Sequence, residues 1–274
     1  MNTHRTFRLE KYREYLYKKE LSQNTVSVYL YAANKFLLDQ GREEVTQQSV
    51  ETYASRIRET YKKSTSNLYL IALNQYLIWL GLDKYCVRVK GIQRKKRAEN
   101  VLDKDEYKKL LSYVTDKNDR KYYAIIKTLA GTGIRISELR YITTDTVCLG
   151  IAEICNKGKT REVYIGEPLK KELLSYCELC HISGGVIFRG NKNTPITRSA
   201  VNQKLMKIAQ AAGVDTSKVH PHAFRHLFAK EYMKKYRNIA ELSCILGHES
   251  VETTMIYLAN SRQEYIERLS GLDL

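Results

Sequence analysis

The chain has 274 residues, of which 43% are hydrophobic and 10% aromatic, a composition that supports a sizeable core and argues against wholesale disorder. Lysine and arginine number 46 against 30 acidic residues, giving a formal net charge of +16 and a pI near 9.4. This excess favours nucleic acid as the partner, because released counterions drive binding to phosphate backbones. No apolar stretch approaches the roughly 20 residues of a membrane span, and no signal-peptide core opens the chain, so we expect a cytoplasmic protein without a membrane partner.

The first 90 residues show apolar side chains at helical spacing throughout. Residues 22–41 place Val26, Tyr29 and Ala33 on one face, and Gly41 follows as a stop. The same periodicity predicts helices over 46–61 and 64–80, with a short one near 8–19. This region is also the more basic one, since 1–97 holds 19 basic and 9 acidic residues against 27 and 21 in 98–274.

A run of four cations, Arg94, Lys95, Lys96 and Arg97, interrupts the helical pattern. Such a run is typical of a solvated linker, and a linker that crosses a phosphate backbone is an equal alternative. The sequence therefore predicts a helical domain over 1–90, a basic linker over 91–100 and a second domain over 101–274.

The second domain is predicted to be mainly helical with one small antiparallel sheet. A capped helix starts near Leu102, a further helix covers 122–130, and the glycines of 131–133 open another helix with Arg135 in its first turn. Between 142 and 165 the β-branched residues predict short strands around a turn at 156–160, and the members of this set are Val147, Ile151, Ile154, Val163 and Ile165. Helices follow at 168–180, 197–212, 222–235, 238–246 and 250–258. The fold class is mostly α, of the α+β type.

Two patterns invite a metal or cofactor. Cys177, Cys180 and His181 spell CxxCH, which is found in haem attachment and in halves of zinc sites, but no export signal and no second CxxC accompany it. Histidines 220, 222, 226 and 248 lack a carboxylate at a zinc-enzyme spacing such as HExxH, and two nearby arginines would repel a dication. We expect no metal and no cofactor.

Four short segments carry side chains suited to phosphate chemistry. They are GTGIRISEL at 131–139, NKGK at 156–159, HAFRH at 222–226 and LGHESVETTMIYLA at 246–259. Taken singly, each has a plain structural explanation: Arg135 pairs with Glu138 three residues on, Lys157 is a solvated turn residue, and Tyr257 is one of 21 tyrosines.

In this order and spacing the four segments resemble the signature of the tyrosine recombinases, also called the phage integrase family, and the spacing is most similar to that of Xer-type members. The resemblance covers essentially the whole chain, with 1–97 similar to the family's core-binding domain. It implies a catalytic set of Arg135, Lys157, His222, Arg225 and His248 around one phosphate, with Tyr257 as the nucleophile. All six positions match the family pattern.

Elementary chemistry agrees with these roles. Displacement at a phosphodiester requires fixed positive donors, and a guanidinium grips two phosphate oxygens while keeping its charge. Arg135 and Arg225 are the expected clamp, with Glu138 orienting Arg135. His222 is the expected proton acceptor for the tyrosine, and the resemblance assigns protonation of the 5′ oxygen to Lys157, with Lys159 as a weaker substitute.

The resemblance further implies a site-specific recombinase that works without a metal through a 3′-phosphotyrosine and a Holliday junction. The expected partner is double-stranded DNA with paired inverted half-sites, bound by a tetramer of this chain alone or together with a related recombinase, at the bacterial nucleoid. Expected DNA contacts are Lys62, Lys63, the linker cations Arg94–Arg97, Arg198 and Lys204. The tail from Ala259 docks either on a neighbouring subunit or on its own domain.

Two other classes remain as alternatives, a type IB topoisomerase and a non-catalytic DNA-binding protein. The biological task, whether dimer resolution, inversion or movement of a mobile element, stays open at this stage.

Overall fold

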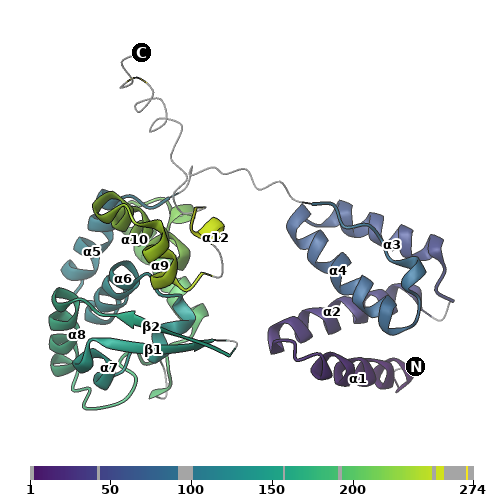
Figure 1. Cartoon of the computed structure of the whole chain (residues 1–274), viewed down its shortest axis with the longest axis horizontal. Helices are drawn as coiled ribbons and strands as arrows, with labels where there is room; N and C mark the ends of the chain where they lie inside the picture. The colour runs from purple at the N-terminus through teal and green to yellow at the C-terminus, as the bar shows by residue number, and fades with distance from the viewer. Residues whose placement is uncertain are drawn as a thin grey trace. The chain divides into compact units, whose positions relative to one another are not determined.

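A computed structural model describes residues 3–41, 44–91, 101–156, 158–190, 193–248, 251–255 and 270. The chain divides into two compact units, Met1–Lys95 and Lys96–Leu274 (Figure 1). The division falls within the predicted linker 91–100, of which 92–100 lie outside the described residues. No helix among the described residues combines the length and apolar character that a membrane span requires.

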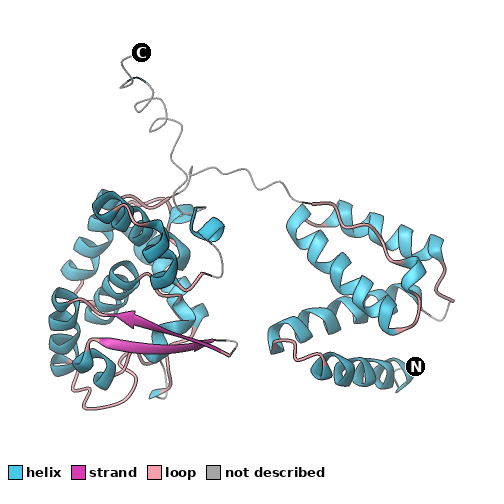
Figure 2. Cartoon of the chain, viewed as in Figure 1, coloured by secondary structure: helices cyan, strands magenta, loops and turns pink. Residues whose placement is uncertain are grey.

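The first unit is built from helices, as the periodicity predicts (Figure 2). They are α1 (Thr3–Lys18), α2 (Gln23–Gln40), α3 (Gln47–Thr60), α4 (Lys63–Trp79) and the short 3₁₀ helix η1 (Asp83–Tyr85). Ser22 and Thr46 cap α2 and α3 through their side-chain oxygens, which accept from backbone N–H groups of the first turn. The core of this unit combines aliphatic side chains with a group of aromatic rings, in which the Tyr12 ring lies 4.9 Å from that of Tyr76 and 5.1 Å from that of Trp79.

The second unit contains the other described helices and the sheet. Its elements are α5 (Lys104–Asp116), α6 (Arg120–Thr132), η2 (Ile136–Tyr141), α7 (Thr144–Leu149), β1 (Ile151–Asn156), β2 (Lys159–Tyr164), α8 (Glu167–Leu179), α9 (Arg198–Ala211), η4 (Thr216–Lys218), α10 (Pro221–Tyr236), α11 (Ile239–Leu246) and α12 (Val251–Met255). The prediction of a mainly helical domain with one small sheet is confirmed.

The sheet is a two-stranded antiparallel hairpin, in which Ile151 pairs with Tyr164 and Asn156 with Lys159. Its inward face carries buried Ala152, Ile154 and Val163. The prediction of a strand at Val147 is wrong, because this buried residue lies in α7. Thr143 and Thr146 form a capping box that starts this helix, so local side-chain hydrogen bonds outweigh the β preference of one valine.

The segment after α6 also differs from its prediction. The helix continues through Gly131 to Thr132 and ends at Gly133, which adopts the left-handed φ of +63°. Residues 136–141 then form a 3₁₀ helix rather than an amphipathic α-helix, and Arg135 is its N-cap rather than a member of its first turn.

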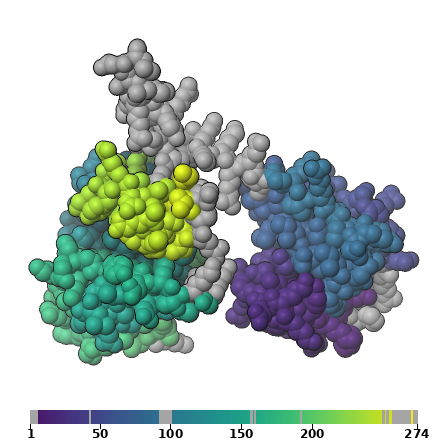
Figure 3. All heavy atoms as spheres, viewed as in Figure 1, coloured from purple at the N-terminus to yellow at the C-terminus, as the bar shows by residue number. Residues whose placement is uncertain are grey.

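The helices near the C-terminus close over the hairpin. Helix α10 packs on α6, and α11 contacts both α10 and β2. In the space-filling view the yellow-green atoms of this part of the chain lie directly against the teal and green atoms of the rest of the unit (Figure 3). Three segments that are far apart in the sequence therefore lie close together: the C-terminal end of α6, the strand β2 and the C-terminal end of α11.

Candidate active site

Arg135 is held by Glu138, as predicted, through two contacts. The backbone N–H of Arg135 donates to Glu138 Oε2 at 2.7 Å, and its Nη1 donates to Oε1 at 3.1 Å. Glu138 is only 2% exposed, whereas the Arg135 side chain is 33% exposed. The buried carboxylate therefore anchors an arginine whose guanidinium still reaches the surface.

Arg225 is the most deeply buried cation of the site, at 1% exposure. Its Nη1 donates to the carbonyl of Gly133 at 2.8 Å, and its Nη2 donates to the carbonyl of Leu246 at 2.5 Å. Both acceptors are backbone carbonyls at helix ends, where they lack helical partners. Arg225 thus joins the end of α6 to the end of α11.

His248 follows α11 and contacts Arg225 directly. The distance from Arg225 Nη2 to His248 Nε2 is 2.8 Å, and His248 Nδ1 lies 2.7 Å from the hydroxyl of the fully buried Thr254. A guanidinium has no acceptor, so Nε2 accepts and the ring hydrogen sits on Nδ1, which donates to Thr254. Burial and the guanidinium of Arg225 lower the pKa of His248 to about 4, which agrees with a neutral ring.

His222 and Arg225 share α10, one turn apart, as the sequence predicts. The His222 ring reaches the surface. Partial loss of hydration, followed by the neighbouring charge of Arg225, lowers its pKa below the usual value of 6.5. A neutral imidazole at pH 7 can accept a proton, which is the property that its predicted role requires.

One charged residue that lies among these side chains is not among those predicted from the sequence. Arg161 on β2 donates from Nη2 to Glu138 Oε2 at 2.8 Å, so that two arginines share one buried carboxylate. The signal that would have found it is its position in the strand. Arg161 lies on the same face as Val163, where an alternating pattern calls for an apolar side chain.

Two predicted catalytic residues, Lys157 and Tyr257, lie outside the described residues. Their neighbours are described. Gly158 occupies the hairpin turn with φ +75°, and Thr254, which holds His248, lies three positions before Tyr257. The predicted tail from Ala259 onward is likewise outside the described part of the chain, apart from Ser270.

The predicted DNA contacts fall in different surroundings. Lys62 and Lys63 are exposed at the start of α4, and Arg198 is exposed at the start of α9, near enough to His222 to affect its pKa. Lys204 pairs with Asp119 at 2.9 Å. The linker cations Arg94, Lys95, Lys96 and Arg97 are outside the described residues.

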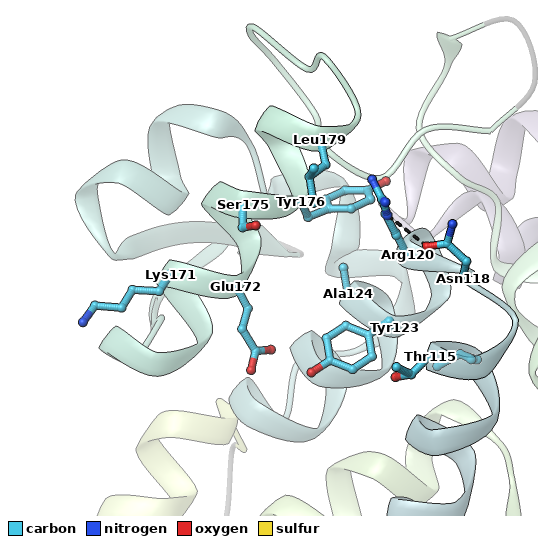
Figure 4. A pocket seen from close by; sticks show the side chains of 11 residues that line it. Thr115, Asn118, Arg120, Tyr123, Ala124, Lys171, Glu172, Ser175, Tyr176 and Leu179 are labelled. Carbon is cyan, nitrogen blue, oxygen red and sulfur yellow. Dashed lines mark hydrogen bonds between the residues drawn. The ribbon is translucent and has the colours of Figure 1, made fainter.

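Other features of the second unit stand apart from this cluster. A cavity of about 440 Å³ opens between α5, α6 and α8, where the side chains of Tyr123 and Glu172 point into the same space (Figure 4). Cys177 is buried and Cys180 exposed. Within the described ranges, no three His, Cys, Asp or Glu side chains are arranged to hold one metal ion.

Comparison with known proteins agrees with this architecture. The model of the phage integrase family matches residues 100–264, and that of the phage integrase N-terminal SAM-like domain matches residues 9–84. The chain is 28% identical over 275 residues to tyrosine recombinase XerA of Pyrococcus furiosus, covering 97% of this chain and 94% of that one. It is also 28% identical to tyrosine recombinase XerD of Shewanella oneidensis, over 87% of each chain.

Solved structures show the same fold. A crystal structure of XerA recombinase has a TM-score of 0.56 and 26% identity, with 97% of each chain covered. A lambda integrase tetramer bound to a Holliday junction has a TM-score of 0.72 at 18% identity, covering 92% of this chain and 76% of that one. The chain belongs to the phage integrase family, the family of the tyrosine site-specific recombinases, and the resemblance drawn from the four motifs is confirmed. The recombinase relatives support recombination over the topoisomerase and non-catalytic alternatives.

Proposed function

We propose that this chain cuts and rejoins DNA at specific sites through a 3′-phosphotyrosine on Tyr257, without a metal ion. The observation that carries the proposal is one hydrogen-bonded network that contains Arg135 and Arg225, 90 positions apart. Glu138, Arg161 and the Leu246 carbonyl link the two arginines, and His248 contacts Arg225. Two fixed guanidinium groups match the charge that develops on the non-bridging oxygens of a phosphate under attack.

In the proposed cleavage step the Tyr257 oxygen bonds to phosphorus while the bond from phosphorus to the 5′ oxygen breaks. The tyrosine proton passes to neutral His222, and Lys157, with Lys159 as the weaker candidate, protonates the departing 5′ oxygen. Religation reverses these transfers with a 5′ hydroxyl from another strand. Because the phosphotyrosine retains the energy of the broken bond, no cofactor is needed.

His248 supports the phosphate indirectly in this arrangement. Its Nε2 accepts from Arg225, and its Nδ1–H donates to Thr254, so the ring orients one clamp arginine and ties it to α12. Direct donation from Nε2 to the phosphate requires a hydrogen on that nitrogen. We assign His248 to the positioning of Arg225 in the free protein, and to the phosphate only once DNA has changed its protonation or hydrogen bonding.

The proposed substrate is duplex DNA with paired inverted half-sites, bound by four subunits in the cytoplasm at the nucleoid. The solved relatives include a lambda integrase dimer on a core site and a tetramer on a Holliday junction. The four subunits are copies of this chain, or of this chain and a related recombinase. Dimer resolution, inversion, and integration or excision of a mobile element are the three tasks consistent with this chemistry.

Covalent trapping tests the proposal. The matched control is Tyr265→Phe, which changes the tyrosine eight positions after Tyr257. Wild type, Tyr257→Phe and this control are incubated with a library of nicked duplexes in EDTA and denatured in SDS, and the attached DNA is sequenced. Wild type and Tyr265→Phe should retain DNA and thereby reveal the target site, whereas Tyr257→Phe should retain none. Attachment by Tyr257→Phe would show that another residue is the nucleophile, and loss of all attachment in EDTA alone would contradict the metal-free reaction.

A further inference from the structure

Arg161 occupies a position where the hairpin would ordinarily carry an apolar side chain. It pairs across the strands with Ile154 and shares the inward face with Val163, both of which are buried. The Arg161 side chain is itself only 15% exposed. Burial lowers the pKa of its guanidinium, against the opposing effect of Glu138. Burying a charged group at this position costs its hydration free energy. The contacts of Arg161 must therefore provide a benefit that an apolar core residue would not provide.

The first contact completes the coordination of Glu138. Oε1 accepts from Arg135 Nη1, while Oε2 accepts from the backbone N–H of Arg135 and from Arg161 Nη2, at 2.7 and 2.8 Å. Donors on both oxygens and from two chain segments prevent the carboxylate from rotating. The direction in which Glu138 holds the Arg135 guanidinium therefore depends on β2.

The second contact reaches the end of α11. Arg161 Nε lies 3.4 Å from the carbonyl oxygen of Leu246, the same oxygen that accepts from Arg225 Nη2. The next residue, Gly247, leaves room for this approach, because a Cβ there would collide with Cδ and Nε of Arg161. The Arg161 side chain thus passes directly over the turn that leads to His248.

We propose that Arg161 is a positioning residue for DNA cleavage. It lies on β2, the strand that follows the turn of Lys157, and from there it holds Glu138 and the Leu246 carbonyl. By holding both groups, Arg161 aligns Arg135 and Arg225 with each other. The inference rests on the proposed function. It links three parts of the site that the chain supplies separately: the hairpin, the 131–138 segment and the end of α11.

The unpaired part of Arg161 agrees with a role beyond stability. Its Nη1 is buried and has no hydrogen-bond partner among the described residues. A buried donor without a partner destabilises the folded state. A smaller apolar residue would avoid that cost but would release both Glu138 and the turn at Gly247.

The test uses the DNA site recovered by covalent trapping, as a nicked duplex with either an ordinary scissile phosphate or a neutral methylphosphonate. In the methylphosphonate a methyl group replaces one non-bridging oxygen, so alignment of two arginines matters less. Arg161→Lys keeps the charge but cannot donate to Glu138 and Leu246 together. We expect wild-type DNA affinity and melting temperature, with cleavage slower by about a hundredfold on the phosphodiester and by about tenfold or less on the methylphosphonate.

Arg120→Lys is the matched control, since Arg120 is exposed and its Nε donates to Asn118, two residues away. It should cleave both substrates at the wild-type rate. Combining Arg161→Lys with Arg135→Lys should cost little more than Arg135→Lys alone, because both changes disturb one network.

Three results would overturn the inference: cleavage of the phosphodiester by Arg161→Lys at the wild-type rate, an equal loss on both substrates, or full additivity with Arg135→Lys. An equal loss would mark a residue that serves only the fold. If the wild type itself attaches to no DNA, the proposed function fails instead, and the two failures are thereby distinguished.

Discussion

The two ring nitrogens of His248 have different partners, and this difference fixes its state. Arg225 donates to Nε2 and Thr254 receives from Nδ1, so a second proton on the ring would face a guanidinium at 2.8 Å. The same guanidinium acts on His222, after the larger effect of partial burial. Burial and, after it, the charge of one arginine therefore favour the neutral form of both histidines, and neutrality is what a proton acceptor for a tyrosine needs.

The substitution His222→Gln should abolish the acid limb, which is the fall of the cleavage rate at low pH. At limiting DNA concentration the rate reports the free enzyme, so the wild-type rate should be flat above pH 6.5 and should fall only once the pH passes below the lowered pKa of His222. The variant should be slower by about a hundredfold at pH 7.5 and should lack this fall at acidic pH. Single-turnover cleavage at a series of pH values measures both effects.

His226→Gln is the matched control for that experiment, because it removes a histidine one turn further along α10. Its acid limb should match the wild type. If the limb persists in His222→Gln, the titrating group is another one, and His222 is not the proton acceptor.

The residues of the site differ in how far the sequence revealed them. Arg135, Glu138, Arg225 and His248 were predicted from motif order, and the structure brings them together. Arg161 and Thr254 were not, because their roles depend on which carbonyl or ring the fold brings near them. Motif spacing contains no information on such long-range contacts, and only the charge on an inward strand face pointed to Arg161.

Among the elements, the turn that ends α6 bears on both stability and catalysis. Gly133 has a left-handed φ of +63°, and a Cβ at this position would lie 2.6 Å from Phe228 Cδ1 and 2.9 Å from Leu246 Cδ2. Its carbonyl accepts from Arg225 Nη1 at 2.8 Å. Any shift that relieves the clash would therefore move an anchor of the buried arginine.

Gly133→Ala should lower the free energy of unfolding by about 3 kcal/mol, from left-handed strain and overpacking together. Gly213→Ala is the control, because Gly213 has a similar φ of +66° and open space around the missing Cβ. It should cost about 1 kcal/mol from strain alone. Urea unfolding measures both, and equal losses would show that α10 and α11 yield to the new methyl group.

At this scale the long helices were the most predictable elements, since each carries several turns of apolar periodicity and a stop or cap. The failures are short elements. Val147 lies in a six-residue helix set by the Thr143–Thr146 capping box, and residues 136–141 form a 3₁₀ turn shaped by the Glu138 carboxylate. In both places a few side-chain hydrogen bonds decide the backbone, whereas periodicity needs a longer window to be read.

In the molecule as a whole, the two units contain different residues with which their unfolding can be followed. The single tryptophan, Trp79, lies in the first unit, which contains only one of the six histidines, His4. The second unit holds His220, His222, His226 and His248, and burial is the first cause of a lowered pKa in all four. Each unit has its own hydrophobic core, so we expect two separate unfolding transitions.

Acid should therefore destabilise the second unit selectively. Well above pH 6.5 these four histidines are neutral in both folded and unfolded chains and contribute no pH dependence. Below pH 6.5 the unfolded chain binds protons that the folded one does not, so the free energy of unfolding falls until the folded-state pKa of about 4 for His226 and His248. Both units are helical, so circular dichroism reports both transitions, whereas Trp79 fluorescence reports the first unit. Lowering the pH from 7.5 to 5.5 should reduce the urea midpoint of the circular dichroism transition that Trp79 fluorescence does not follow, while the midpoint of Trp79 fluorescence stays the same.

His226→Gln isolates one contributor, because it keeps a polar side chain that does not titrate. It should reduce the pH-dependent loss of the second unit by about 1 kcal/mol at pH 5.5, whereas His181→Asn, at an exposed position, should leave the loss unchanged. A Trp79 midpoint that falls together with the circular dichroism signal would instead show that the two units unfold as one. A loss of unchanged size in His226→Gln would assign the acid sensitivity to the other three histidines of the site.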